Sequence, residues 1–346
     1  MKFSSNIAAG LGSLRNVGDA MRETGILGKC VIVSGPNSEI IAGREVKRTL
    51  EKDGISYFEI ISDAEPTTYG VEKLSREVMK FGKDPIPIVA IGGGKTIDVC
   101  KFVSNSLDRP LVVIPTLLSS DAIASGYSVI WNGSSNQAVK TKTPNLIVGD
   151  YDILKKQPEK FVSSGVGDML SKVSSLFDWR LSFWMGEETY SDFAMNVARS
   201  TTELLQKRIL DISKRNYIGI ETLFLAEVTD GYLMELAGTT RVAAGSEHLF
   251  TFAMETLDPG KTHGIYCALG TIMMSYLQSR ENLDVRGYLQ ASGVPTSAEE
   301  AGLNRNHIIK ALTMAHRMRR WYTILGTNGI SEGKAERLAK YTQVID

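Results

Sequence analysis

The amino-acid sequence predicts an α/β protein in which a Rossmann-like domain with a parallel sheet, residues 1–150, precedes an all-helical domain, residues 151–346. The length of 346 residues exceeds what one ordinary core accommodates, which favours two domains. In the first part, short β-branched runs alternate with helical patterns. After residues 148–151 these runs disappear, and apolar residues recur with the period of a helix.

The predicted strands of the first domain are nearly continuous apolar runs. They lie at residues 29–34, 57–62, 86–91 and 111–114, with helices expected at 38–52, 71–81 and 96–107. Such runs separated by helices are typical of a parallel sheet that is covered on both faces. The polar residues 133–136 predict the tip of a hairpin between strands at 128–131 and 138–140. In the second domain, helices are expected at 163–184, 190–212, 217–238, 245–256, 264–278, 305–325 and 331–341.

Composition and charge restrict the classes of function. Lys+Arg and Asp+Glu are both 39, so the formal net charge is zero and gives no electrostatic reason to expect a nucleic-acid or membrane partner. No stretch approaches the roughly 20 apolar residues of a membrane span, and no signal peptide is evident, so a cytoplasmic location is expected. The three cysteines are too sparse for a disulfide framework. Cys30 and Cys100 lie in apolar stretches, which predicts buried, unreactive thiols.

A glycine-rich turn joins a predicted strand to a predicted helix. The residues Gly92-Gly93-Gly94-Lys95-Thr96 allow a close approach of the backbone to a ligand, and the helix N-terminus that follows offers N–H groups to a diphosphate. The spacing is neither the six-residue Rossmann pattern nor a Walker A loop, and an ordinary tight turn explains it equally. Lys95 stays exposed or neutralises phosphate, whereas Asp98 suits the start of a helix.

Small and hydroxyl residues follow the next predicted strand. Thr116, Ser119 and Ser125 are candidates for cofactor contacts, because open α/β sheets bind ligands at the carboxyl ends of their strands. Asp121, in the same segment, is either a loop cap or a functional carboxylate.

Two histidines and an aspartate in the helical domain suggest a metal site. His248 and His263 are separated by a turn, and Asp168 lies near the front of another helix. Two imidazoles and one carboxylate leave an open coordination position on zinc, as a catalytic site requires. A capping aspartate and two unrelated histidines explain the same pattern. The helical pattern at 305–325 carries arginines at 317, 319 and 320, which form a solvated face or bind an anion or another subunit.

Five segments in this order resemble the iron-containing alcohol dehydrogenase superfamily, which also contains the dehydroquinate synthase group. They are GGGKTID (92–98), PTLLSSDAIAS (115–125), SSGVGDMLSK (163–172), AAGSEHLF (243–250) and THGIYCALGTIMMSYL (262–277). Among its members, the chain is most similar to the archaeal sn-glycerol-1-phosphate dehydrogenases, especially over GTIMMSYL (270–277), GVPTSAEEAGL (293–303) and IIKALTMAHRMR (308–319).

The resemblance implies a metal-dependent NAD(P)H oxidoreductase that reduces dihydroxyacetone phosphate to sn-glycerol 1-phosphate, for archaeal ether lipids. It places the cofactor diphosphate on residues 92–96, together with Asp98, and Thr116, Ser119 and Ser125 beside the nicotinamide. Asp121 matches a substrate-contacting aspartate, and the proton is expected to arrive either through metal-bound water or through a relay that includes Asp121. Asp168, His248 and His263 match the metal ligands, with zinc expected and iron possible. A homo-oligomer is also expected.

Two departures from the family pattern concern the substrate. The chain has Ser120-Asp121-Ala122 where the family has His or Asn, then Asp-Gly. It also has Phe252 at the substrate-contacting position of a family histidine, in the segment that the family writes HLFSH. Both departures suggest an alternative, a glycerol or polyol dehydrogenase that acts on an unphosphorylated substrate.

Two further classes of protein agree less well with the sequence. A dehydroquinate synthase-like lyase usually has glutamate at the first ligand position and a paired-histidine motif, and neither is present here. A relative that only binds nucleotide is disfavoured, because a buried carboxylate without its metal is costly. The turn at 35–38 has no aspartate that would bind a ribose 2′-hydroxyl and reject a 2′-phosphate, so NADPH, or both NADPH and NADH, is expected.

Overall fold

The computed structural model describes residues 6–26, 28–63, 65–82, 84–133, 136–279 and 284–346. The chain forms two compact units, Met1–Gln157 and Pro158–Asp346. The first contains the sheet, and the second has helices joined by loops, with no strand among its described residues. The predicted fold class is therefore confirmed.

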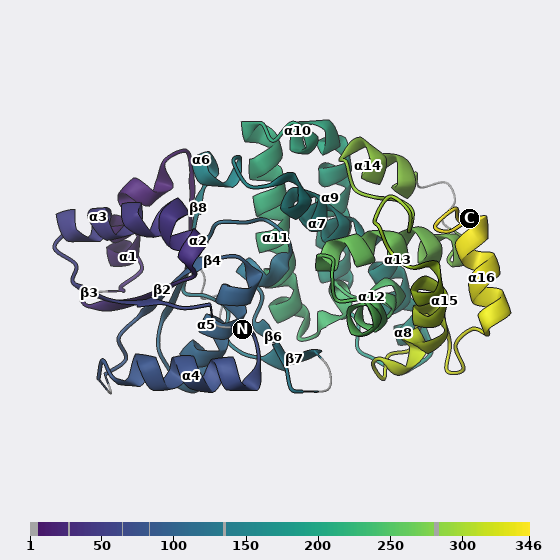
Figure 1. Cartoon of the computed structure of the whole chain (residues 1–346), viewed down its shortest axis with the longest axis horizontal. Helices are drawn as coiled ribbons and strands as arrows, with labels where there is room; N and C mark the ends of the chain where they lie inside the picture. The colour runs from purple at the N-terminus through teal and green to yellow at the C-terminus, as the bar shows by residue number, and fades with distance from the viewer. Residues whose placement is uncertain (1–5, 27, 64, 83, 134–135, 280–283) are drawn as a thin grey trace. The chain divides into compact units, whose positions relative to one another are not determined.

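The sheet of the first unit is parallel. Within the described residues it has six strands in the order β1-β8-β5-β4-β2-β3 (Figure 1). The strands are β1 (Asn6–Gly10), β2 (Cys30–Ser34), β3 (Tyr57–Ile61), β4 (Ile88–Gly92), β5 (Leu111–Pro115) and β8 (Leu146–Asp150). A separate antiparallel hairpin pairs β6 (Tyr127–Trp131) with β7 (Asn136–Lys140), as predicted, although Ser134 and Ser135 of its expected tip lie outside the described residues.

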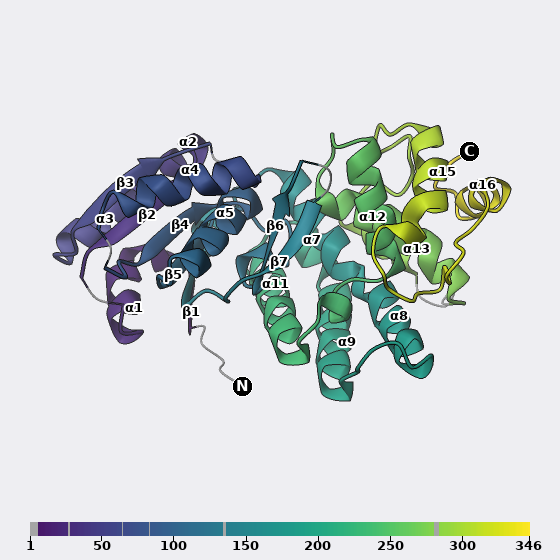
Figure 2. The ribbon, with the colours of Figure 1, turned by 90° about the horizontal axis from the view of Figure 1, so that it is seen from below.

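Helices cover both faces of this sheet. Its helical elements are η1 (Ser13–Asn16), α1 (Val17–Glu23), α2 (Pro36–Ser38), the π-helical η2 (Glu39–Gly43), α3 (Arg44–Lys52), α4 (Thr68–Met79), α5 (Gly94–Ser106), η3 (Asp121–Ile123) and α6 (Tyr151–Leu154). Figures 1 and 2 show α1 and α3 on one face and α4 and α5 on the other. Alternate strand residues such as Ile32, Val89 and Val112 pack with Val46 and Leu50 of α3 in one buried core, as the period of two of a strand requires.

The order of the strands reverses next to β2. The chain passes from β2 to β3 on one side and then returns to place β4 on the other. In open α/β sheets, the carboxyl ends of the strands at such a point form the ligand-binding edge. The glycine-rich turn follows β4 directly, so it lies at this edge, and Gly92 pairs in register with Pro115 at the end of β5.

The second unit is built from helices alone. They are α7 (Glu159–Leu170), α8 (Lys172–Trp184), α9 (Asp192–Lys207), α10 (Ile209–Ser213), α11 (Tyr217–Ala237), η4 (Thr240–Val242), α12 (Ser246–Leu257), α13 (His263–Leu277), α14 (Val285–Ala291), α15 (Arg305–Met314), η5 (Ala315–Arg317) and α16 (Glu332–Tyr341). Side-chain caps mark several starts: Ser191 accepts from Ala194 at α9, and Asn216 accepts from Gly219 at α11.

Three sequence predictions about individual elements were wrong or incomplete. The strands β1 and β8 were not predicted, nor was the short helix α14. The helix expected over 163–184 is interrupted at Ser171, whose hydroxyl donates to the Asp168 carbonyl 2.6 Å away. The helix expected over 305–325 ends by Arg317, because later backbone groups have tertiary partners: the Ile324 N–H donates to Asp178, and the Tyr322 carbonyl accepts from Arg241.

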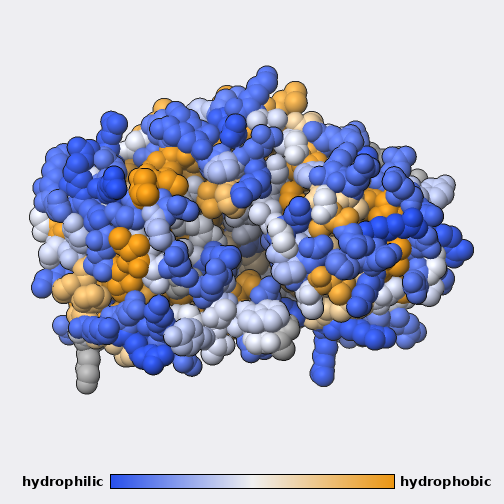
Figure 3. Space-filling view, viewed as in Figure 1, coloured by the Kyte–Doolittle hydropathy of each residue, from blue (hydrophilic) through white to orange (hydrophobic). Residues whose placement is uncertain are grey.

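The face in Figure 3 is mostly hydrophilic, and its apolar side chains form small separate groups. Among the described residues, no helix is long and apolar enough to cross a membrane.

Candidate metal centre and cofactor edge

The three predicted ligands come together in the second unit. Asp168 lies near the end of α7, His248 in the first turn of α12, and His263 at the start of α13. The Asp168 Oδ1 and His248 Nε2 atoms are 3.5 Å apart, and the two imidazole ring centroids are 5.1 Å apart. A fourth donor, Cys267, joins them: one ligand atom from each of the four residues lies within 4.8 Å of every other. The arrangement therefore has the composition and compactness of a metal site.

Glycines allow the two ligand-bearing helices to approach closely. A Cβ atom on Gly264 would lie 1.7 Å from the Ser164 carbonyl oxygen, and one on Gly167 would lie 2.1 Å from the Gly264 carbonyl oxygen. No side chain larger than hydrogen fits at this crossing of α7 and α13. Because Gly167 precedes Asp168 and Gly264 follows His263, the same crossing brings these two ligands together.

Carboxylates outside the group orient both histidines. The Nδ1 atom of His248 lies 2.9 Å from Glu247 Oε1, and that of His263 lies 2.8 Å from Glu255 Oε1. A carboxylate at one ring nitrogen fixes the tautomer and leaves the other nitrogen, Nε2, to bind a metal ion. The donor set and its orientation thus fit a divalent ion.

Acidic side chains also hold the start of α12. Asp178 accepts hydrogen bonds from the Ser246 N–H and the Ile324 N–H, both at 2.7 Å, and Glu247 accepts one from the Gly245 N–H at 2.6 Å. These bonds satisfy amides at a helix N-terminus. They fix the turn from which His248 projects.

The group concentrates charge in a buried place. Burial disfavours the ionised form of Asp168, but Lys172 and the histidines outweigh it and hold the pKa of Asp168 well below its usual range. Burial likewise opposes charge on His248 and His263, yet Cys267 and the carboxylates raise the pKa of both histidines. The anions that stabilise protons here would stabilise a metal cation in the same way.

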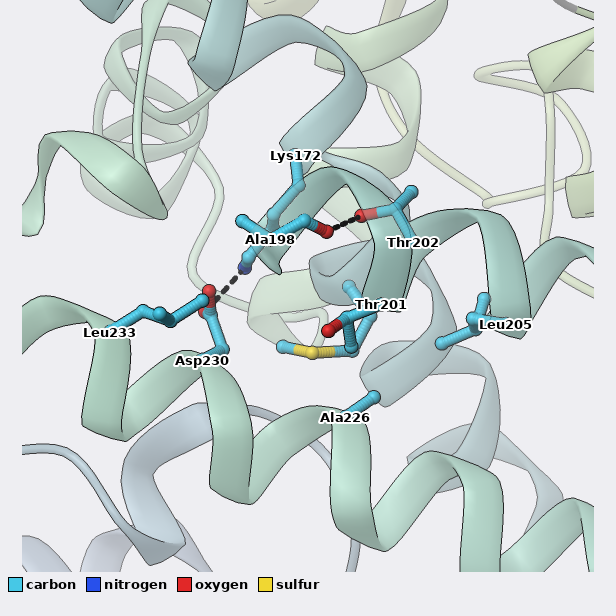
Figure 4. Close-up of a pocket in the computed structure, with 9 residues that line it drawn as sticks. Lys172, Ala198, Thr201, Thr202, Leu205, Ala226, Asp230 and Leu233 are labelled. Carbon is cyan, nitrogen blue, oxygen red and sulfur yellow. Dashed lines mark hydrogen bonds and ion pairs between the residues drawn. The ribbon is translucent and has the colours of Figure 1, made fainter. Parts of the chain in front are cut away.

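Lys172 supports the group from the side of Asp168. Its ammonium lies 3.3 Å from Asp168 Oδ1 and 3.0 Å from Asp230 Oδ2 of α11, and its side chain is almost wholly buried. Figure 4 shows Lys172 directed at Asp230 across a small cavity that Thr202 and Leu205 also line. No motif indicated Lys172, although its spacing of four from Asp168 would put both residues on one face of the single helix predicted over 163–184.

Phe252 packs beside the two histidines. Its ring centroid is 6.0 Å from that of His248 and 6.5 Å from that of His263. The Arg319 guanidinium carbon lies 4.6 Å from the centroid of the Phe252 ring. Burial lowers the pKa of Arg319, and Glu255 opposes that effect, although a guanidinium keeps its charge. Arg319, which the motifs had not placed in the site, is thus separated from the two histidines by the ring of Phe252.

The predicted cofactor residues lie together in the first unit. Gly93 precedes α5 and no side chain caps this helix, so its first N–H groups point towards the edge of the sheet. Thr116 donates its backbone N–H to the Gly92 carbonyl at 3.0 Å, and a Cβ on Gly93 would lie 2.8 Å from Leu117. The turn and the segment after β5 are therefore packed against each other.

The other predicted cofactor residues have partners within this unit. Lys95 is exposed and pairs with Glu65, with 2.8 Å between its Nζ and Oε2. Asp98 and Ser125 both contact Lys101, a fully buried lysine whose Nζ lies 2.9 Å from Asp98 Oδ1 and 3.2 Å from Ser125 Oγ. No sequence motif indicated Lys101, which joins α5 to the segment after β5.

The remaining predicted residues of this segment are partly accessible. Thr96 and Ser119 are half-buried. Asp121, which starts η3, is also half-buried, and its carbonyl accepts from the Ala124 and Ser125 N–H groups. Asp121 therefore belongs to the unit that carries the glycine turn, whereas Asp168 and Phe252 belong to the helical unit.

A parallel sheet with a glycine turn and a helical unit with an Asp–His–His group define the class of the protein. The family model described as iron-containing alcohol dehydrogenase matches residues 8–158. A glycerol dehydrogenase from Schizosaccharomyces pombe has the same fold, with a TM-score of 0.80 and 20% identity over 98% of this chain and 88% of its own.

Relatives that are more similar in sequence narrow the class. The chain is 32% identical to a glycerol-1-phosphate dehydrogenase (NAD(P)+) of Methanosarcina mazei, over 100% of this chain and 97% of the relative. It is 34% identical to one of Hyperthermus butylicus, over 100% of this chain and 99% of the relative. The chain belongs to the family of these glycerol-1-phosphate dehydrogenases, as its motifs had indicated.

Proposed function

We propose that the protein is a metal-dependent NAD(P)H dehydrogenase that reduces dihydroxyacetone phosphate to sn-glycerol 1-phosphate. The observation that carries the proposal is the buried group of Asp168, His248 and His263 in a chain that matches glycerol-1-phosphate dehydrogenases along its full length. A cytoplasmic location and a homo-oligomeric state stay predictions from the sequence.

In this proposal, the three residues hold a divalent metal ion. When bound, the metal would polarise the ketone and the reduced nicotinamide would supply the hydride. Glu247 and Glu255 keep the two imidazoles in the orientation that presents Nε2, and Asp168 stays ionised because of its low pKa. The closed packing of α7 on α13 excludes water from this side of the ligands.

The glycine turn would bind the cofactor diphosphate. Gly92, Gly93 and Gly94 expose backbone, and the uncapped N-terminus of α5 offers N–H donors together with the positive end of its dipole. Lys95 would leave its exposed ion pair with Glu65, which contributes little to stability, and would pair with a phosphate oxygen instead. NADPH and NADH are both accepted in this proposal, because the turn after β2 begins with Gly35-Pro36 and has no carboxylate to reject a 2′-phosphate.

A phosphorylated substrate needs a cation, and Arg319 provides one. Phe252 stands where the family pattern has a polar substrate contact, and the Arg319 guanidinium lies over its ring. A guanidinium presents a fork of N–H groups that matches phosphate oxygens. We assign phosphate recognition to Arg319. To Asp121 we assign the contact with the substrate hydroxyl group and the transfer of its proton.

Phe252 also motivates the second candidate, a glycerol or polyol dehydrogenase. An apolar ring cannot donate a hydrogen bond, and losing such a bond costs about 1–3 kcal/mol when nothing replaces it. The two candidates differ in one assay: purified, zinc-loaded protein oxidises NAD(P)H with dihydroxyacetone phosphate or with dihydroxyacetone. The proposal expects a much higher kcat/KM for the phosphorylated ketone, and equal or better turnover of dihydroxyacetone would overturn it.

A further inference from the structure

Cys267 occupies a position that the three-ligand description leaves unexplained. It follows His263 by four residues on α13, so the two side chains lie on the same helical face. Its Sγ atom lies 3.6 Å from His248 Nε2, and the residue is fully buried. The Thr251 hydroxyl, at 3.5 Å, also points to this sulfur. Cys30 and Cys100, by contrast, belong to the first unit and lie in its apolar interior.

Two of the distances within the group are close to the edges of a tetrahedron around zinc. Zinc bonds of about 2.3 Å to sulfur and about 2.0 Å to nitrogen or oxygen, at tetrahedral angles, give edges of about 3.5 Å for S···N and about 3.3 Å for N···O. The separations are 3.6 Å from Cys267 Sγ to His248 Nε2 and 3.5 Å from His248 Nε2 to Asp168 Oδ1. A thiol that hydrogen-bonds to His248 would take a similar distance, and the cobalt experiment below separates that arrangement from a shared metal ion.

We propose that Cys267 is a fourth ligand of the metal ion, and that its sulfur makes this site select zinc over iron. Thiolate ligands are soft and favour zinc, whereas carboxylates and imidazoles accept several divalent ions. With four protein ligands, zinc would bind the ketone by taking a fifth ligand, as catalytic zinc sites sometimes do, so this ligand set is compatible with the reaction proposed above. The inference concerns the metal named in the proposed function and rests on that part of it.

Cobalt(II) is the probe for this inference, because it replaces zinc and reports its ligands in absorption spectra. Metal-free protein is titrated with Co²⁺, and spectra are recorded for the wild type, Cys267→Ser and Cys100→Ser. Cys100 is a matched control, since it is also a fully buried cysteine but lies outside the ligand group. Circular dichroism confirms that each variant is folded, and the wild-type spectrum tests the inference even if Cys267→Ser fails to fold.

The expected result is a near-ultraviolet thiolate-to-cobalt charge-transfer band in the wild type and in Cys100→Ser, and its loss in Cys267→Ser. Zinc affinity in Cys267→Ser should fall by at least about tenfold, the lower end of what removing a partner outside the ligand shell costs. The preference for Zn²⁺ over Fe²⁺ in competition should fall with it. Bound cobalt without the band in the wild type, or a band that persists in Cys267→Ser, would overturn the inference.

Dehydrogenase assays on the same samples separate this inference from the proposed function. A wild type with the charge-transfer band but without activity on dihydroxyacetone phosphate would refute the substrate assignment and leave the thiolate ligand standing. A wild type that is active and binds cobalt without the band would refute only the role of Cys267. A protein that binds no cobalt at all would overturn both.

Discussion

Glu255 Oε1 lies 2.8 Å from Nδ1 of His263, which follows it by eight residues and belongs to the next helix. Removal of this carboxylate, in Glu255→Ala, should weaken zinc binding by about 10- to 100-fold, because the imidazole then loses the partner that sets its tautomer and orientation. Competition with a chromophoric chelator measures the affinity. The zinc affinity of Glu255→Gln should lie between those of the wild type and Glu255→Ala, since the amide oxygen still accepts the Nδ1 proton. Unchanged affinity in Glu255→Ala would contradict the orienting role.

The glycine turn can be tested by adding one methyl group. A Cβ on Gly94 would meet only Ala122 at 3.6 Å and Ser120 at 3.9 Å, which are ordinary contacts, so Gly94→Ala should fold with an unchanged Tm. If the cofactor diphosphate lies against this backbone, the methyl group should weaken NADPH binding by about tenfold or more, or about 1.4 kcal/mol. Fluorescence titration measures the binding. Gly333→Ala, where the new methyl group meets nothing within 4 Å, is the control.

The phosphate assignment predicts a split between two substrates. Arg319→Met should raise KM for dihydroxyacetone phosphate by about 10- to 100-fold, which corresponds to the loss of a hydrogen bond to a charged group. Turnover of dihydroxyacetone should change little, because that ketone has no phosphate. Arg320→Met removes an exposed arginine next to it and should leave both values unchanged. Equal losses on both substrates would show that Arg319 has only a structural role.

The raised pKa of Asp178 predicts how the stability of the fold depends on pH. Burial and the nearby Glu247 raise the pKa of Asp178 from 3.8 to about 6. A carboxyl whose folded-state pKa is raised stabilises the fold fully below pH 3.8, and this contribution is lost as the pH rises through 6. The shift corresponds to about 3 kcal/mol.

The comparison with Asp178→Asn isolates this effect. Between pH 4 and pH 7 the wild type should lose stability relative to the variant by up to about 3 kcal/mol, whatever the offset between them at pH 4. Denaturant unfolding at a series of pH values measures the difference. A constant difference across this range would mean that Asp178 titrates near its usual pKa.

The parts of the fold that the sequence predicted are those with an unambiguous local signal. The runs that became β2, β4 and β5 are apolar throughout and are buried on both faces. The edge strand β1 has the sequence NIAAG, partly exposed and rich in small residues, so nothing local distinguishes it from a loop. Its strand conformation comes from pairing with β8, more than 130 residues away.

The residues of the candidate site also divide into those with a local sequence signal and those without one. Asp168, His248 and His263 were predicted from motifs, and Cys267 could have been, because its spacing of four from His263 puts it on the same helical face. Glu255 has no such signal, since it meets His263 only through the turn between two helices. The burial of Lys101 is unusual for a lysine, and it depends on Asp98 in the same helix together with the Ser125 carbonyl, which is distant in sequence.

In the proposed function, Asp168, His248 and His263 hold the metal ion on which the reaction depends. The most direct test is to restore zinc to metal-free protein and to measure bound zinc and NAD(P)H oxidation with dihydroxyacetone phosphate in the same sample. His307→Ala is the control for His263→Ala, because His307 also pairs with a carboxylate through Nδ1 but lies outside the ligand group. The account predicts that activity rises with zinc to about one ion per chain in the wild type and in His307→Ala, and that His263→Ala gains neither zinc nor activity. Full activity in the metal-free wild type, or retained zinc and activity in His263→Ala, would contradict it.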